Sequence, residues 1–264
     1  MADMVLFEMY SGYRDQLIER QNFYVEQAKS RLLDQFTDEA ISAEADRVAD
    51  DSWERRGRNF NPEFDDEGSS AEAARDDGIW RYELLTDLRD SVRLSIVAGF
   101  FHEWEKNLRQ WLVDQVRHWH SGQVTKETIW KQNLSQIFEL LESFGWPIKT
   151  AAFFPDLDAC RLVVNVHKHG DGPSLTELAS SYPQYLEHPL EAVRGQIGKM
   201  WLSPSHENLK ITDDNLEAFS EAVLAFWREL PENICSSHIK NPPHWFLKAI
   251  EKDERNKNGS PADV

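Results

Sequence analysis

Five polar residues with chemically active side chains share one face of the helix predicted within DLDACRLVVNVHKHG. At about 100° per residue, this face holds Asp158, Arg161, Asn165, Lys168 and His169. His167 points to another side of the helix. An imidazole that titrates near pH 7 can move a proton to or from a ribose hydroxyl, and a guanidinium can stabilise phosphoryl oxygens. Arg161, Asn165 and His169 are therefore candidate catalytic residues for metal-independent phosphodiester cleavage, with Lys168 in support.

A purely structural role accounts for the same residues. Lys168 and His169 fall in the last turn before Gly170, where the helix dipole favours cations whether or not they act on a substrate. Arg161 is equally able to pair with Asp158 or with a carboxylate on a neighbouring element. Both interpretations stay open at this point.

Glu103 is a second supporting candidate. It follows Val92, Ile96 and Gly99 on one stripe of a long predicted helix, so we expect its carboxylate to face protein. A buried carboxylate needs a cation or hydrogen-bond donors, and Arg161 is the expected partner. That pair would be either a structural contact or the support of an active-site arginine.

The sequence predicts no metal or cofactor site. His118 and His120 are two residues apart near a helix end, which is the wrong spacing for two ligands on one helical face. The glycines of HGDG follow a helix, whereas those of a phosphate-binding loop precede one. Cys160 and Cys235 stand alone, so neither a disulfide framework nor a Cys-x-x-Cys site is expected, and a reducing cytoplasm is the expected location.

Apolar residues recur with helical spacing along most of the chain, and no alternating strand pattern of useful length occurs. We therefore expect an all-α fold, an antiparallel bundle of long helices. A first helix runs from about Leu6 to Phe36, and later helices begin at the N-caps Thr37 or Asp38 and Thr212 or Asp213. The expected organisation is an acidic helical region over 1–56, a flexible acidic linker over 57–78, a helical bundle over 79–251 and a disordered tail over 252–264.

The charge of the chain restricts its partners. Its net charge of −17 opposes non-specific attraction to nucleic acid or to an anionic membrane. No run of about eighteen apolar residues is present, so we expect no membrane span. Residues 37–90 contain 17 Asp or Glu against 7 Arg. This acidic segment predicts a solvated face, a docking surface for a basic partner, or a mimic of nucleic acid.

The order of three segments resembles the HEPN superfamily over residues 80–231. These segments are RLSIVAGFFHEWEKNLRQWL, DACRLVVNVHKHGDG and LKITDDNLEAFSEAVLAFWREL. The resemblance implies a helical bundle that usually forms homodimers, and in many members a metal-independent endoribonuclease of toxin, abortive-infection or other antiviral defence systems. Asn165, His169 and Gly170 match the polar residue, histidine and glycine of the superfamily motif, whereas Val164 stands where its arginine belongs. Arg161, one turn earlier, would then have to replace that arginine.

Two functions follow from these observations. One is a ribonuclease of a bacterial defence system, with His169 transferring the proton, Arg161 stabilising phosphate and Asn165 orienting the reacting groups. The other is a catalytically inactive helical subunit of a defence complex that docks protein partners through its acidic N-terminal half.

Incubation of purified protein with mixed RNA in EDTA separates these two functions. The ribonuclease hypothesis expects cleavage that is lost in Arg161→Ala and His169→Ala, because each variant removes one of the groups that act on the phosphodiester. The binding hypothesis expects no cleavage by the native protein, and cleavage that is equal in all three proteins would be due to neither residue.

Overall fold

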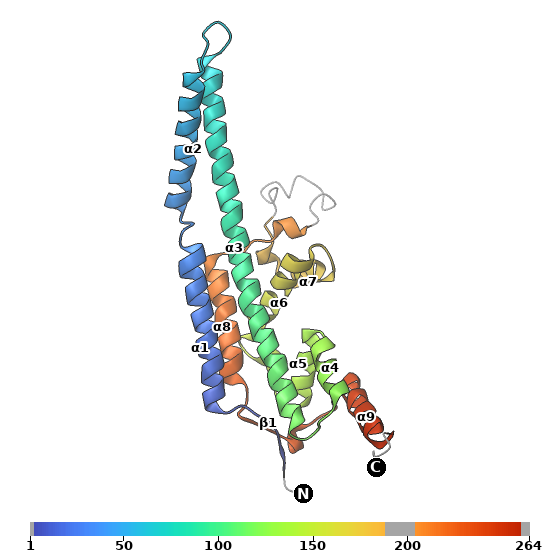
Figure 1. The fold of residues 1–264 in the computed structure, drawn as a ribbon. Helices are drawn as coiled ribbons and strands as arrows, with labels where there is room; N and C mark the ends of the chain where they lie inside the picture. Colours follow the sequence, from blue (N-terminus) through green and yellow to red (C-terminus); the bar gives the residue numbers. More distant parts are fainter. Residues whose placement is uncertain (1–2, 188–203, 260–264) are drawn as a thin grey trace, which may run out of the picture.

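The computed structural model describes residues 3–187 and 204–259 of the chain, which is all-α apart from one small sheet (Figure 1). The predicted fold class is therefore confirmed. Within the described residues, no helix combines the length and apolar character needed to cross a membrane.

The bundle is built around the C-terminal half of α3 (Glu67–Arg117). This half packs against α1 (Ser11–Ala28), α6 (Phe154–His169) and α8 (Asp213–Glu229). It can contact all three because its apolar residues occupy a wide surface. The fully buried ones include Val97, Phe100, Trp104, Leu108 and Leu112.

Polar contacts at both ends of α1 fix its direction against α8. Lys29, just past the end of α1, pairs with Glu217 near the start of α8 at 2.5 Å. Arg14, in the first turn of α1, donates to the carbonyl oxygens of Arg228 and Leu230 at the end of α8. The two helices are therefore antiparallel, as expected for a bundle.

A two-stranded antiparallel sheet closes one end of the bundle. It joins β1 (Val5–Glu8) to β2 (Asn233–Cys235), and Phe7 of β1 packs on Trp111 and Phe144 in the core. The expectation of a first helix from Leu6 to Phe36 is wrong at both ends, because Leu6 lies in β1 and α1 passes at Lys29 into a π-helical turn, Lys29–Leu33. The remaining helices are α4 (Gln123–Lys131), α5 (Leu134–Ser143), α7 (Pro173–Ser181) and α9 (His244–Gly259). Short 3₁₀ turns occupy Ile148–Thr150, Pro183–Tyr185, His206–Asn208 and Ser236–His238.

Two helices project beyond the bundle as a long hairpin (Figure 1). One is α2 (Asp38–Arg58) and the other is the N-terminal half of α3, and we call residues 38–90 the arm. Thr37 caps α2 by accepting from the amide of Ala40, as the sequence predicts. The expected flexible linker over 57–78 is wrong, because α2 extends to Arg58 and α3 already begins at Glu67.

Small residues explain why the apolar periodicity of the sequence does not predict this hairpin. Gly78 sits so close to α2 that an added Cβ would lie 2.9 Å from the Cβ of Ala49 and 3.1 Å from the carbonyl oxygen of Ala45. Helices that pack through Ala and Gly carry little apolar periodicity, which is the signal used to recognise helices in a sequence. The carboxylate of Asp66 then starts α3 by accepting from the amide of Ser69 at 2.7 Å.

The expected disordered tail over 252–264 is also wrong where the structure describes it, since α9 continues to Gly259. Residues 260–264 lie outside the described part of the chain. Asp253 on α9 is 4% exposed and lies at the N-terminus of α4. Its carboxylate accepts from the amides of Val124 and Thr125, at 2.9 and 2.8 Å, and from the Thr125 hydroxyl at 2.7 Å.

Gly122, the N-cap residue of α4, makes this contact possible. A Cβ at Gly122 would lie 1.9 Å from an oxygen of Asp253, so a residue with a side chain could not occupy this position without displacing the carboxylate. Asp253 thus supplies, from α9, the acceptor that a neighbouring side chain usually supplies at a helix start. Burial alone would raise the pKa of Asp253, but the hydrogen bonds from Thr125 and Val124 outweigh it and lower that pKa from 3.8 to about 2.

We expect Asp253→Asn to lower the free energy of unfolding at pH 7 by about 2 kcal/mol, because a depressed carboxyl pKa stabilises the folded state at every pH above the unfolded pKa. In the native protein this contribution is lost as the pH falls from about 4 to about 2. The difference in the free energy of unfolding between the native protein and the variant should therefore vanish over that range. Urea unfolding at a series of pH values measures it. Glu254→Gln, next to it and exposed, is the matched control and should unfold like the native protein.

Candidate functional site

Two nitrogens of the Arg161 guanidinium donate to carboxylates of its own chain. Its Nε donates to Oδ1 of Asp158 and an Nη donates to Oε1 of Glu177 on α7, both at 2.8 Å. The arginine side chain is 11% exposed. Tyr182 donates to the second oxygen of Asp158 at 3.2 Å. This network closes the polar face of α6 on the side of Arg161.

The pKa shifts within this network have consistent directions. Burial alone would lower the pKa of Arg161, but the hydrogen bond and charge of Asp158, together with Glu177, raise it above its ordinary value. Burial and the negative charge of Asp158 raise the pKa of Tyr182 to about 12. Asp158 and Glu177 therefore stabilise the charged guanidinium and compete with any phosphate for its donors.

The other predicted site residues lie further along α6 and are not joined to Arg161. Asn165 is half-buried, whereas Lys168 and His169 are exposed. Nζ of Lys168 lies 3.3 Å from Nε2 of His102 on α3. Within the described residues, no hydrogen bond or ion pair connects Arg161, Asn165 and His169 with one another. The shared helical face is thus present, but the three side chains do not form one constellation in a single copy of the chain.

Glu103 does not meet Arg161, so the expected pair is wrong. Its side chain is 55% exposed and pairs with Lys106, one turn along α3. The reason lies at Gly99, where an added Cβ would be 2.0 Å from the hydroxyl of Tyr24 on α1. Tyr24 covers this part of the stripe, which leaves the carboxylate one turn later in solvent.

Sequence reasoning missed an imidazole and carboxylate pair beside the end of α6. Nδ1 of His206 lies 2.9 Å from Oδ1 of Asp171, and the ring lies next to Gly170, which ends α6 with φ +70°. The two residues are 35 positions apart, so no local pattern predicts their contact. Both side chains are exposed. Across the described residues, His, Cys, Asp and Glu form no cluster of three that could hold a metal ion.

The arm presents a second candidate surface. Of the described residues between 34 and 91, none belongs to the main hydrophobic core of the bundle. Large apolar side chains instead lie exposed along it, among them Trp80, 61% exposed, and Phe64 near the tip, 85% exposed. The others are Trp53, Phe60, Ile79, Tyr82, Leu84 and Leu88. Exposed apolar side chains in such number on one element are typical of a binding surface.

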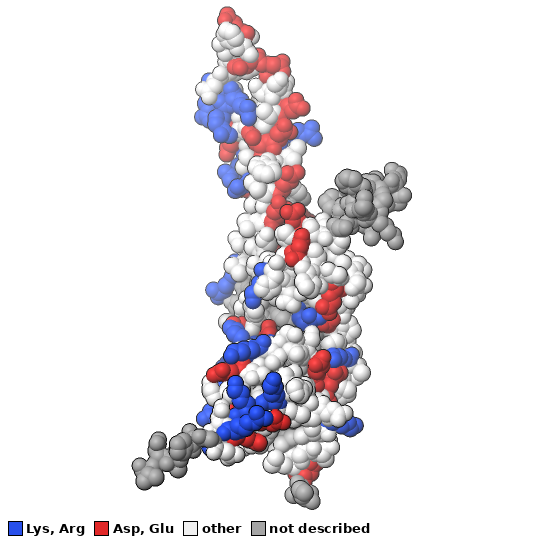
Figure 2. Space-filling model, turned by 90° about the vertical axis from the view of Figure 1, so that its right-hand side faces the viewer, with Lys and Arg blue, Asp and Glu red and all other residues white. Residues whose placement is uncertain are grey.

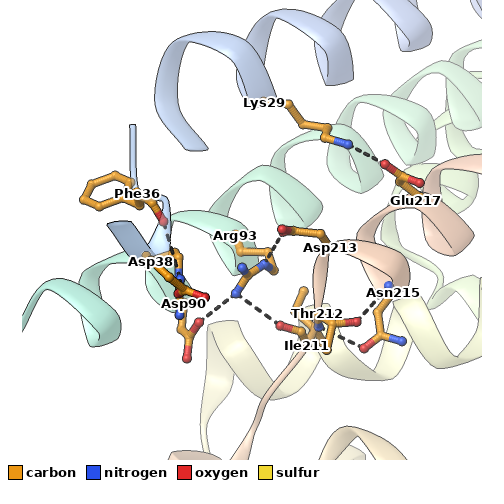
Figure 3. A network of polar contacts seen from close by, with 11 residues as sticks. Lys29, Phe36, Asp38, Asp90, Arg93, Ile211, Thr212, Asp213, Asn215 and Glu217 are labelled. Carbon is orange, nitrogen blue, oxygen red and sulfur yellow. Dashed lines mark hydrogen bonds and ion pairs between the residues drawn. The ribbon is translucent and has the colours of Figure 1, made fainter. Parts of the chain in front are cut away.

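Polar contacts hold the base of the arm in a fixed position (Figure 3). Arg93 of α3 is buried and donates to Asp90, to Asp213 at the start of α8 and to the carbonyl oxygen of Ile211, at 2.6, 2.7 and 3.3 Å. One turn earlier, Arg89 pairs with Asp38 at the start of α2 at 2.6 Å. Arg93 therefore joins α3 to the start of α8 where the arm leaves the bundle, and Arg89 joins α2 to α3 at the base of the arm.

Comparison of the chain with family models, with curated proteins and with solved structures finds no match in any of the three. The function has to be argued from the geometry of this chain. The ribonuclease hypothesis stays a prediction.

Arg161→Ala should lower the free energy of unfolding by about 2–3 kcal/mol, because it leaves the mostly buried Asp158 without its cation. His169→Ala removes an exposed side chain and should change the free energy of unfolding by less than about 0.5 kcal/mol. Urea unfolding of both variants at pH 7 measures the difference. An Arg161→Ala protein as stable as the native one would show that the ion pairs contribute nothing to the fold and would leave the guanidinium available for another role.

Proposed function

We propose that this protein is a helical binding subunit that docks a protein partner through the arm. The observation that carries the proposal is the arm itself. None of its described residues belongs to the main core of the bundle, yet Arg93 fixes its base to the start of α8, and it presents exposed aromatic side chains. An element that the core does not use, and that exposes costly apolar surface, is expected to have a partner.

The state of the α6 face favours binding over catalysis. A phosphate-stabilising arginine needs free donors at the reaction site, whereas Asp158 and Glu177 already accept from two nitrogens of Arg161, and their negative charges would repel a phosphate. The negative charge of the chain also opposes RNA. Partner binding by the acidic N-terminal half, one of the two functions expected from the sequence, therefore fits this geometry better than RNA cleavage does.

Removal of the outer part of the arm, residues 46–77, tests the proposal while leaving the bundle whole. Gly78 packs on Ala45 and Ala49, so residues 46–77 can be replaced by a short glycine-rich turn. We expect the melting temperature of the shortened protein to stay within about 3 °C of the native value, because the removed residues lie outside the main core. Circular dichroism measures both helix content and melting.

Photocrosslinking in the cells that naturally express the protein then locates the partner. A photoreactive phenylalanine analogue is placed at Phe64 or Tyr82 on the arm, and at the exposed Leu247 on α9 as a control. We expect one discrete adduct from the arm positions and none from Leu247. Mass spectrometry identifies the partner, which should bind the purified native protein and not the shortened one.

Two outcomes would overturn the proposal. One is equal binding of the purified partner to the native and shortened proteins. The other is RNA cleavage in EDTA by the native protein that His169→Ala abolishes, since cleavage would assign the function to α6.

A further inference from the structure

A groove of about 490 Å³ runs between α2 and α3 on one face of the arm. Its floor consists of small side chains and its walls consist of three large, exposed ones. The floor includes Ala49, Ala74 and Gly78, and the walls are Trp53, Ile79 and Tyr82. The close approach of the two helices at Gly78 makes the floor shallow and continuous, which is the form required to accept an elongated apolar ligand.

Carboxylates flank this groove on both sides. Two of them line the groove, and helical spacing places the others beside Trp53 on α2 or beside Ile79 on α3. They are Asp46, Asp50 and Glu54 on α2, and Glu72, Asp76 and Glu83 on α3. All six are exposed, and none forms an ion pair with any described residue. Arg75 is the basic side chain that lines the groove.

Some carboxylates elsewhere on the arm are neutralised by arginines. Glu44 pairs with Arg81 at 2.9 Å and with Arg47 at 2.7 Å, and Asp77 pairs with Arg56 at 3.3 Å. On the face drawn in Figure 2, acidic side chains run along much of the arm while basic ones gather towards one edge. The six carboxylates beside the groove have no such ion pair among the described residues.

We propose that the groove binds an amphipathic helix of a partner protein, with an apolar face that enters the groove and lysines or arginines along its two edges. The proposal rests on the proposed function and names the chemistry of the partner. A third helix laid between α2 and α3 would cover Trp53, Ile79 and Tyr82 and complete a three-helix bundle. Its basic edges would lie opposite the six unpaired carboxylates.

The same charges disfavour two other occupants. A second copy of the arm would bring six unpaired carboxylates against six, and like charges across an interface oppose association. A nucleic acid would bring phosphates against the same carboxylates. The charge pattern thus selects a basic protein segment.

Synthetic helical peptides of about 20 residues test this inference on the full-length protein. The probe carries leucines at helical spacing on one face and lysines on the flanking positions. One comparison peptide has glutamate in place of every lysine, and another has serine in place of every leucine. Fluorescence anisotropy of labelled peptide measures binding. We expect micromolar affinity for the leucine and lysine peptide and at least tenfold weaker binding of both comparison peptides.

Paired variants locate the binding site. Trp53→Ala should weaken binding about tenfold, because it removes a wall of the groove. Trp130→Ala is the matched control, since Trp130 is 39% exposed on α4, outside the arm, whereas Trp53 is 41% exposed. Asp46→Asn with Asp50→Asn should weaken binding severalfold and reduce its salt dependence, whereas Glu139→Gln with Glu229→Gln on the bundle removes the same charge and should leave binding unchanged.

Equal affinity for the serine and leucine peptides, or equal effects of Trp53→Ala and Trp130→Ala, would overturn the groove as the site. Sedimentation showing a dimer that Trp53→Ala dissociates would overturn the basic partner in favour of a second copy. These results would leave the proposed function standing if the arm still crosslinks to a partner in cells. If the peptide binds to the groove but the arm forms no crosslink to a partner in cells, the proposed function is wrong.

Discussion

Buried Arg93 joins three parts of the chain at the point where α3 leaves the bundle. A guanidinium removed from water needs acceptors, and Asp90, Asp213 and the carbonyl oxygen of Ile211 provide them from α3 itself and from the start of α8 (Figure 3). Asp213 also places negative charge at the N-terminus of α8, where the helix dipole favours it. Because α3 continues without interruption from the bundle into the arm, this contact fixes the direction of the arm as well as the start of α8.

The fold was predictable where the signal is local. Thr37 and Thr212 cap their helices as expected, and Gly170 ends α6 with the positive φ that glycine permits. The hairpin was not predictable from apolar periodicity, because Gly78 and its alanine neighbours pack closely without large side chains. The continuation of α9 past residue 252 was not predictable either, because Asp253 is held by partners about half the chain away in sequence.

In the candidate site, too, local features were predictable and contacts between distant segments were not. Helical geometry correctly placed the five polar residues within one helix, α6, and gave Arg161 a carboxylate partner on its own helix, Asp158. It could not identify what lies opposite that helix. The second partner is Glu177 of α7, not Glu103, because the stripe of α3 that carries Gly99 faces Tyr24 of α1 and not α6. A helical wheel gives the direction of a side chain, whereas its partner depends on how distant helices pack.

The contact between Asp253 and the start of α4 has a consequence for the order in which the chain folds. During synthesis, Gly122 and the first amides of α4 are made more than a hundred residues before the carboxylate that completes them. Until α9 has left the ribosome, the N-terminus of α4 has only water for its amide donors. Helix α9 is therefore the element that completes an earlier one, and its removal takes support from the middle of the chain.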